Sequence, residues 1–422
     1  MKGLIKFLSP FAPDQSGASG VLYGLGGLIV ICDAGGCTGN ICGFDEPRWF
    51  LRSSGNALPE NGTPGVILSA GLRDMDAILG RDDQLIEKLK DAAQKLGSPF
   101  AALIGTPVPA VIGTDFPALR RMAERRCHLP VLGIPCTGTG LYDEGEEAAY
   151  LALFERFASV PSWKSSEKAA ASEGTAVFHN PVPETNRTSF SKFSEEISPN
   201  AADSLSENKP ASRPADPLEK TVPGRLGILG ATPLNLSTAK PFERLSEALG
   251  TDDLLCYGAA GGLKAVALAP TAEKNIVLSP SGLAAAKKLQ MLFGTPYEVR
   301  YPLLARAFPE APPAAPAETK TFSGKRALVV HQQVLANEAR RRLLSAGCAS
   351  VTVATFFKLE KELAAPGDLH LSEENDLREL LESGEYDLVA ADRYLARCAK
   401  DYAGDWVHLP HFAVSGECAD LE

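Results

Sequence analysis

The sequence predicts an α/β protein of three successive Rossmann-like domains, each a parallel sheet flanked by helices, with a long flexible insertion. Three observations predict this fold class. Short β-branched and aliphatic runs alternate with amphipathic stretches in three separate series. Segments rich in proline, alanine and polar residues separate the series. The 422 residues, 45% of them hydrophobic, are enough to bury several cores.

The first series forms the predicted N-terminal domain, residues 1–160. Residues 82–97 and 116–127 carry apolar side chains at helical spacing, and Gly97 ends the first of these stretches as a helix-terminating glycine. Strands that alternate with such helices pair in parallel. The buried strands are expected at 28–33, 65–70, 100–105 and 130–135.

A segment over 161–223 interrupts this pattern. It is rich in serine, proline, alanine, asparagine, lysine and glutamate and contains few aliphatic residues, so it cannot bury enough apolar surface to offset the entropy of ordering. We expect a flexible linker or surface insertion here, either a plain spacer or a segment that depends on a partner.

Two further series follow the insertion. The middle domain, 224–308, contains a helix predicted at 281–294, and the C-terminal domain, 309–422, opens with a proline- and alanine-rich stretch. No strong residue repeat relates the three series, so only their pattern recurs. The expected strands lie at 225–230, 252–258, 275–280 and 297–303 in the middle domain and at 325–331, 350–356, 386–392 and 406–410 in the C-terminal domain.

Composition excludes several classes of function. A formal charge of −10 and an isoelectric point near 5.3 leave no basic footprint for a nucleic acid. No apolar run reaches the roughly 18 residues of a membrane span, and Pro10 and Pro13 break the short apolar start. We therefore expect a soluble, cytoplasmic protein. Its nine cysteines, an odd number, are expected to stay reduced rather than form disulfides, and clustered cysteines are expected to be metal ligands or redox groups.

Nucleotide-binding motifs are absent from the sequence. The glycines at 24–27 precede the first strand, whereas a dinucleotide-binding glycine motif follows a strand and opens a helix. A phosphate-binding loop of the form G-x-x-x-x-G-K-[S/T] does not occur either. Any nucleotide hydrolysis must therefore come from a partner protein.

Three evenly spaced cysteines, Cys32, Cys37 and Cys42, form the most informative motif. Cys32 closes the first strand and is either a packed core thiol or a ligand. Cys37 and Cys42 lie in the glycine-rich loop that follows. There Gly36 and its neighbours let the backbone approach an inorganic cluster and point amide groups at its sulfurs. We expect this pair to bind metal.

The cysteine spacing matches neither a zinc site nor a single-chain ferredoxin. Two or three thiolates on one loop are an incomplete set. A second copy of the loop, from a symmetry mate or a related subunit, can complete four ligands for a cubane cluster at a two-fold interface. Cys136 also follows a strand and can line the same cleft as a further ligand.

His331 and His411 follow strands of the C-terminal domain and are the candidate catalytic residues. Each lies where an inter-domain cleft is expected, so its imidazole can relay a proton or bind a metal. The alternative for both is a surface or capping histidine.

These motifs resemble component 1 of the nitrogenase superfamily, which includes the dinitrogenase subunits, their cofactor-scaffold relatives and dark-operative protochlorophyllide reductase. The resemblance rests mainly on residues 9–49, where Cys37 of "DAGGC" takes the position of a family cysteine that binds the cluster shared between subunits. Weaker similarities follow in the family's order along the chain: "AALIGTPVPAVIGTDFPAL", "LPVLGIPCTGTG", "NIVLSPSGLAAAKKLQMLFGTPY" and "GKRALVVHQQ".

The sequence also departs from the family. Ala12 and Thr106 stand where the family has two further cluster cysteines, and Ser279 replaces the cysteine that holds a second cofactor. The resemblance therefore implies a smaller cluster, a 4Fe-4S cluster shared between subunits and held by Cys37 and Cys42 from each. It does not imply dinitrogen reduction.

The resemblance implies a reductase component in a homodimer or in a heterotetramer with a related chain. An iron-protein-like ATPase is the expected electron donor, and an unidentified substrate or second cofactor is reduced between the domains. Two alternatives stay open: a non-catalytic scaffold that carries a cluster or metallocofactor during assembly, and a degenerate member that binds no cluster.

Overall fold

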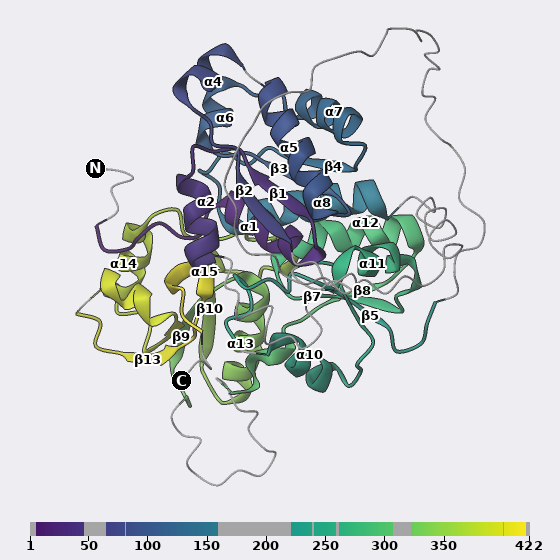
Figure 1. Cartoon of the computed structure of the whole chain (residues 1–422). Helices are drawn as coiled ribbons and strands as arrows, with labels where there is room; N and C mark the ends of the chain where they lie inside the picture. The colour runs from purple at the N-terminus through teal and green to yellow at the C-terminus, as the bar shows by residue number, and fades with distance from the viewer. Residues whose placement is uncertain are drawn as a thin grey trace, which may run out of the picture. The chain divides into compact units, whose positions relative to one another are not determined.

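The computed structural model describes residues 6–45, 65–80, 82–158, 221–238, 240–258, 261–306, 322–399 and 401–418. They form three parallel sheets flanked by helices within one compact unit, which confirms the predicted α/β class (Figure 1). The insertion predicted at 161–223 lies outside the described residues as far as residue 220. No helix among the described residues has both the length and the apolar character needed to cross a bilayer.

In the N-terminal sheet, the strand that precedes the cysteine motif is an interior strand. The order of this sheet is β2 (Val66–Ser69), β1 (Leu28–Ile31), β3 (Ala101–Ile104) and β4 (Val131–Ile134), and all pairs are parallel. Every residue of β1 and β3 is buried, as expected for strands covered on both faces. The loops that follow β1, β3 and β4 therefore meet at one edge of the sheet.

The middle and C-terminal sheets are also entirely parallel. The middle sheet has the order β6 (Leu254–Cys256), β5 (Leu226–Leu229), β7 (Lys274–Val277) and β8 (Tyr297–Val299). The C-terminal sheet has the order β11 (Leu369–His370), β10 (Ser350–Thr355), β9 (Arg326–Val330), β12 (Leu388–Ala391) and β13 (Asp405–His408). Each sheet reverses its strand order beside its first strand, and such switch points are where open α/β sheets bind ligands.

The predicted helices at 82–97, 116–127 and 281–294 occur as α5 (Asp82–Leu96), α7 (Phe116–Cys127) and α12 (Leu283–Phe293). The other helices named in Figure 1 are α1 (Asp14–Leu22), α2 (Gly36–Asn40), α4 (Asp74–Leu79), α6 (Pro107–Ile112), α8 (Tyr142–Phe157), α10 (Pro241–Leu249), α11 (Gly262–Ala267), α13 (Gln333–Ser345), α14 (Glu374–Glu382) and α15 (Phe412–Ser415).

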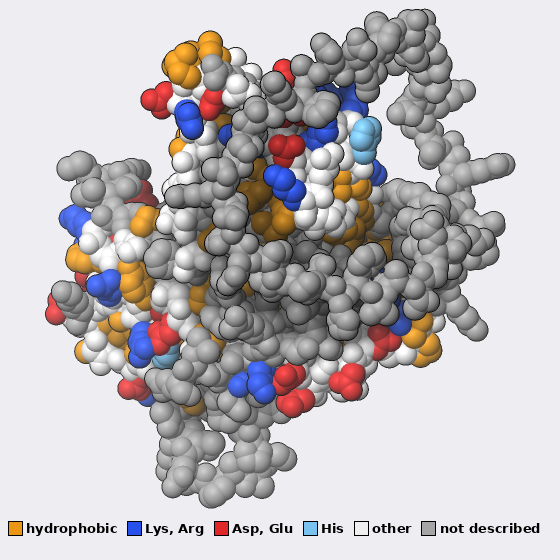
Figure 2. Space-filling view, in the orientation of Figure 1, with side chains coloured by type: hydrophobic (Ala, Val, Ile, Leu, Met, Phe, Trp, Pro, Cys, Tyr) orange, Lys and Arg blue, Asp and Glu red, His pale blue; other side chains and the backbone are white. Residues whose placement is uncertain are grey.

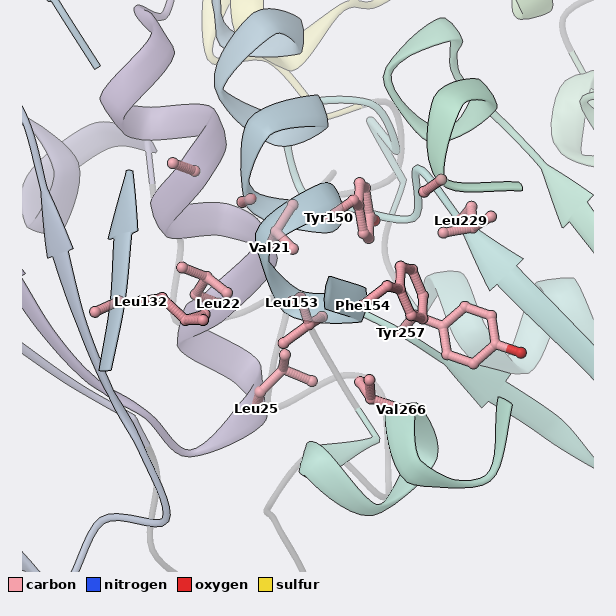
Figure 3. Packing of buried hydrophobic residues seen from close by; sticks show 14 of the residues in the cluster. Val21, Leu22, Leu25, Leu132, Tyr150, Leu153, Phe154, Leu229, Tyr257 and Val266 are labelled. Atoms are coloured by element: carbon pink, nitrogen blue, oxygen red, sulfur yellow. The ribbon is translucent and has the colours of Figure 1, made fainter. Parts of the chain in front are cut away.

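Helix α8 joins the N-terminal sheet to the middle sheet through one continuous core. Its buried side chains pack between α1 on one side and residues of the middle sheet and of α11 on the other (Figure 3). The residues that meet there are Val21, Leu22 and Leu25 of α1, Tyr150, Leu153 and Phe154 of α8, and Leu229, Tyr257 and Val266. This core fixes the first two sheets relative to one another.

Two glycines let α1 and α8 approach until their backbones touch. A Cβ atom on Gly17 would lie 1.8 Å from the carbonyl oxygen of Tyr142, and one on Gly145 would lie 1.8 Å from that of Asp14. Any larger residue at either position would force the helices apart. The crossing thereby sets the positions of Asp14 and Tyr142, which both take part in the sites described below.

Candidate functional site

The cysteine motif folds into a short helical segment at the switch point of the N-terminal sheet. After β1, Gly35 turns the chain with a φ of +123°, a region that favours glycine. Helix α2 and the π-helical turn Ile41–Asp45 follow directly. Cys37 on α2 is half-buried and Cys42 on the π-helical turn is exposed. The two predicted ligands therefore lie on one helical segment that solvent reaches.

Glycines leave open space around this segment. A Cβ atom built on Gly35, Gly36, Gly39 or Gly43 meets no atom of the described residues within 4 Å. Such a face can take a bulky inorganic group or the surface of another chain without rearrangement. The residues present therefore fit one half of the four-thiolate set that holds a 4Fe-4S cluster.

Cys32 and Cys136 differ from this pair because both are buried in the core. Burial, with a further contribution from the charge of Asp33, raises the pKa of the Cys32 thiol to about 12. Burial and then the charge of Asp14 raise the pKa of Cys136 as well. Both residues are packed core thiols in this structure, and a ligand role for either stays a prediction.

Two aspartates lie near Cys37. The Asp14 carboxylate accepts hydrogen bonds from the amides of Thr137 and Gly138 at 2.7 and 2.9 Å, which ties the loop after β4 to the start of α1. Burial raises the pKa of Cys37, and the charges of Asp33 and Asp14 raise it further. The electrostatic potential around this cysteine is therefore negative.

His331 and His411 come together in the core. Their rings stack with centroids 4.1 Å apart and 16° between the ring planes. His331 Nδ1 accepts a hydrogen bond from the Gln332 amide at 2.8 Å, so Nε2 carries the proton and donates to the Pro410 carbonyl at 3.1 Å. Burial lowers the pKa of His331 to about 4 and that of His411 well below its ordinary value. Both rings are therefore neutral near pH 7.

A buried polar network, which the sequence pattern did not predict, links this histidine pair to the other two sheets. His411 Nε2 lies 3.0 Å from the Tyr142 hydroxyl, which donates to Asn235 Oδ1 at 2.8 Å. Because the tyrosine proton goes to Asn235, His411 Nε2 must be the donor in its own contact. Asn235 Nδ2 continues the network by donating to Glu146 at 2.8 Å.

Glu146 is the carboxyl end of this network and is fully buried. It also accepts hydrogen bonds from the hydroxyls of Ser281, at 2.6 Å, and of Thr232. No lysine or arginine of the described residues contacts it. Burial raises the pKa of Glu146 to about 8 although these hydrogen bonds lower it. Ser279, also fully buried, lies beside Ser281 with the two hydroxyls 3.0 Å apart.

A pocket of about 920 Å³ lies beside the cysteine segment. Its walls come from residues 8–13, from 138–141 and from 412–416, and Asn40 of α2 also lines it. The pocket thus lies between the loops of the N-terminal sheet and those of the C-terminal sheet. Its size is in the range of small-molecule sites, roughly 300 to 1,000 Å³.

Asp392, His408 and Glu417 form another group whose ligand atoms lie close together. His408 Nδ1 accepts the Arg393 amide at 3.1 Å, so its Nε2 carries the proton and faces Glu417 at 3.4 Å. Glu417 is also paired with the Arg393 side chain. The histidine offers no lone pair toward the group, and we assign no metal to it.

Comparisons with known proteins agree with this fold. The sequence model of the family described as "Nitrogenase component 1 type Oxidoreductase" matches residues 17–304. The structure is similar to nitrogenase Cp1 at pH 5, with a TM-score of 0.62 at 14% identity over 99% of this chain and 86% of that chain. Nitrogenase Cp1 at pH 6.5 gives a TM-score of 0.59 at 11% identity over 97% and 87%. No curated protein matches the sequence.

Proposed function

The chain belongs to the family of nitrogenase component 1 type oxidoreductases, and from this premise we propose that it is a reductase component that holds an iron-sulfur cluster at a subunit interface. One observation carries the proposal: Cys37 and Cys42 lie on a single helical segment, next to glycines with open space around them. A bound cluster supplies one-electron transfer, and the protein sets its potential through burial, charge and hydrogen bonds.

The other half of the cluster site is proposed to come from a second subunit. A 4Fe-4S cluster takes about four thiolates, and this segment supplies two. Five other cysteines of the described residues are buried: Cys32, Cys136, Cys256, Cys348 and Cys398. A two-fold interface brings the same segment of two chains face to face. The assembly is a homodimer, or a heterotetramer with a related component 1 chain.

The electron donor is proposed to be an iron-protein-like ATPase that docks on α4 and α6. These helices follow β2 and β3 and touch each other at the edge of the sheet that also carries the cysteine segment. Figure 2 shows apolar side chains at the top of the molecule, over this region. The large apolar side chains that the two helices expose are Met75, Ile78, Leu79, Val108, Val111 and Ile112. An apolar patch confined to two short helices suits a partner that binds and leaves, because obligate interfaces bury far more surface.

The substrate is proposed to bind in the 920 Å³ pocket. Asn40 lines this pocket and lies between Cys37 and Cys42 in the sequence, so an electron has a short path from the cysteine segment to a bound molecule. His411 directly precedes Phe412, another lining residue. We retain His331 and His411 as the proposed proton-transfer residues: each neutral ring carries one N–H, which it can give up only by taking up another proton on its second nitrogen.

Cysteine variants test the ligand assignment. The variants Cys37→Ala, Cys42→Ala and Cys348→Ala are each purified under anaerobic conditions. Iron content, sulfide content and the electron paramagnetic resonance signal of the reduced protein are then measured for each. We expect the first two variants to lose the cluster and Cys348→Ala, a buried thiol of another core, to keep it. Loss of iron only in Cys348→Ala would overturn the assignment.

The exposure of Cys42 beside the half-buried Cys37 also favours a second candidate, a scaffold that carries a cluster or metallocofactor for delivery. ATP-dependent reduction of the bound cluster by an iron-protein partner supports the reductase. Transfer of the cluster to an acceptor protein, without such reduction, supports the scaffold. Both are measured on the same purified protein.

A further inference from the structure

Asp33 holds the cysteine helix in place. Its side chain lies at the end of β1 and is 2% exposed. Its Oδ2 accepts a hydrogen bond from the Thr38 amide at 2.8 Å, and its Oδ1 accepts one from the Thr38 hydroxyl at 2.9 Å. Thr38 is the neighbour of Cys37 on α2, so Asp33 fixes the turn of helix that carries this cysteine.

The same carboxylate joins the helix to the neighbouring strand. Ser69, the last residue of β2, donates its hydroxyl to Asp33 Oδ1 at 2.7 Å and accepts the Gly71 amide at 3.0 Å. The Asp33 carbonyl accepts the Leu72 amide at 2.8 Å. Asp33 therefore connects β1, the loop after β2 and the cysteine helix.

Helix α2 lacks a side-chain cap of its own. Its N-cap residue is Gly35, and a cap side chain would accept the amide of the second or third helical residue. Thr38 is the third residue of α2, so Asp33 supplies the missing acceptor from outside the helix. Without it the Thr38 amide would face the buried end of β1 unpaired.

No lysine or arginine of the described residues pairs with the Asp33 carboxylate. Its contacts there are the amide and hydroxyl groups given above. A fixed negative charge beside a cluster favours the oxidised state, because reduction adds a further negative charge. Net charge is one of the main factors that set the reduction potential of such clusters.

We propose that Asp33 is a positioning residue for Cys37 and that its carboxylate keeps the reduction potential of a cluster held by Cys37 and Cys42 low. The second half rests on the proposed function, since it requires a cluster at this pair. A low-potential centre accepts electrons only from a strongly reducing donor, which fits a donor driven by ATP hydrolysis.

Hydrogen exchange in the metal-free protein tests the positioning role independently of any cluster. We expect Asp33→Asn to speed amide exchange in the peptide that covers 34–42 by about tenfold, the effect of losing roughly one net hydrogen bond. Exchange in α13, which belongs to another sheet, should not change. Equal exchange at 34–42 in variant and wild type would overturn the positioning role even if the protein binds a cluster.

Redox titration of the reconstituted protein tests the effect of the charge. Asp33→Asn keeps the shape of the side chain and removes its charge, so the midpoint potential should become more positive. Ser69→Ala keeps the charge and removes one of its donors, so the potential should shift to more negative values. An unchanged potential in Asp33→Asn would overturn the proposal. If Asp33→Asn binds no cluster, the midpoint potential of Ser69→Ala is the deciding measurement. An unchanged potential in Ser69→Ala would then overturn the proposed effect of the Asp33 charge.

Discussion

The imidazole rings of His331 and His411 lie face to face, 4.1 Å between centroids, although one follows β9 and the other follows β13. Both side chains are shielded from water, at 2% and 1% exposure. A positive charge on either ring would be desolvated and would face the other ring at close range. The pair is therefore a neutral contact in the core, and its charge state makes the stability of the fold depend on pH.

Acid should destabilise the protein through this pair. The unfolded chain protonates its histidines near pH 6.5, whereas the folded pKa of His331 is about 4. Between these pH values the unfolded state binds more protons than the folded state. The contribution of this histidine to the free energy of unfolding is therefore greatest above pH 6.5 and falls as pH drops toward 4. Urea unfolding at pH 7 and pH 5 measures this loss. His331→Gln should reduce it, and the exposed His370→Gln should not.

Alkali should destabilise the protein through Glu146. Its folded pKa, about 8, lies above the ordinary value of 4.5, so the folded state holds the proton longer. The stabilising contribution is full below pH 4.5 and is lost as pH rises through 8. Glu146→Gln should be about as stable as wild type near pH 4 and increasingly more stable than wild type as pH rises to 9. The exposed Glu144→Gln on the same helix serves as control, and an identical pH profile in both variants would contradict this account.

Removal of the Tyr142 hydroxyl should cost stability. Tyr142→Phe leaves Asn235 Oδ1 and the His411 N–H without a partner in the core, and an unsatisfied buried polar group costs about 1–3 kcal/mol. Chemical denaturation at pH 7 measures the loss. Tyr297→Phe, at a half-buried position of β8, should change stability by less than about 0.5 kcal/mol. A neutral Tyr142→Phe would show that water replaces the hydroxyl in the network.

Charge placed on the apolar patch of α4 and α6 should slow electron delivery. Ile78 and Val111 are 75% and 86% exposed, so the double variant Ile78→Asp, Val111→Asp should fold normally and retain its cluster. ATP-dependent reduction by an iron-protein partner should be about tenfold slower or worse, as expected when a charge enters an apolar interface. Met291→Asp, 78% exposed on α12, is the matched control. Equal rates in both variants would exclude docking at this patch.

Much of the fold follows from local patterns, because buried parallel strands are continuous aliphatic runs. The predicted strand ends were less accurate. The first strand was expected to reach residue 33, but it ends at Ile31, and the Asp33 side chain accepts hydrogen bonds from Thr38 on the following helix. The sequence pattern did not predict α1, which is rich in glycine and serine. Its position against α8 needs a glycine at residue 17, because a Cβ atom there would clash with the backbone of Tyr142.

The candidate site, like the fold, was predicted from the sequence only in part. Cys37 and Cys42 were predicted to lie together because they are neighbours in the sequence and surrounded by glycines. The network of Tyr142, Asn235 and His411 was not predicted, since its members follow strands of three different sheets and a lone hydroxyl or amide forms no motif. The acidic stretch at the start of α8 was the only local signal: a carboxylate among apolar residues of a buried helix suggests a polar partner elsewhere.

The most direct test of the central claim is the iron and sulfide content of the anaerobically purified protein, measured together with its molecular mass in solution. We expect a brown protein with about four iron and four sulfide per two cysteine segments, in a species larger than one chain. The Cys37→Ala and Cys42→Ala proteins should each be colourless. A colourless, iron-free wild-type protein, or one whose iron survives both substitutions, would rule out a cluster held by this cysteine pair.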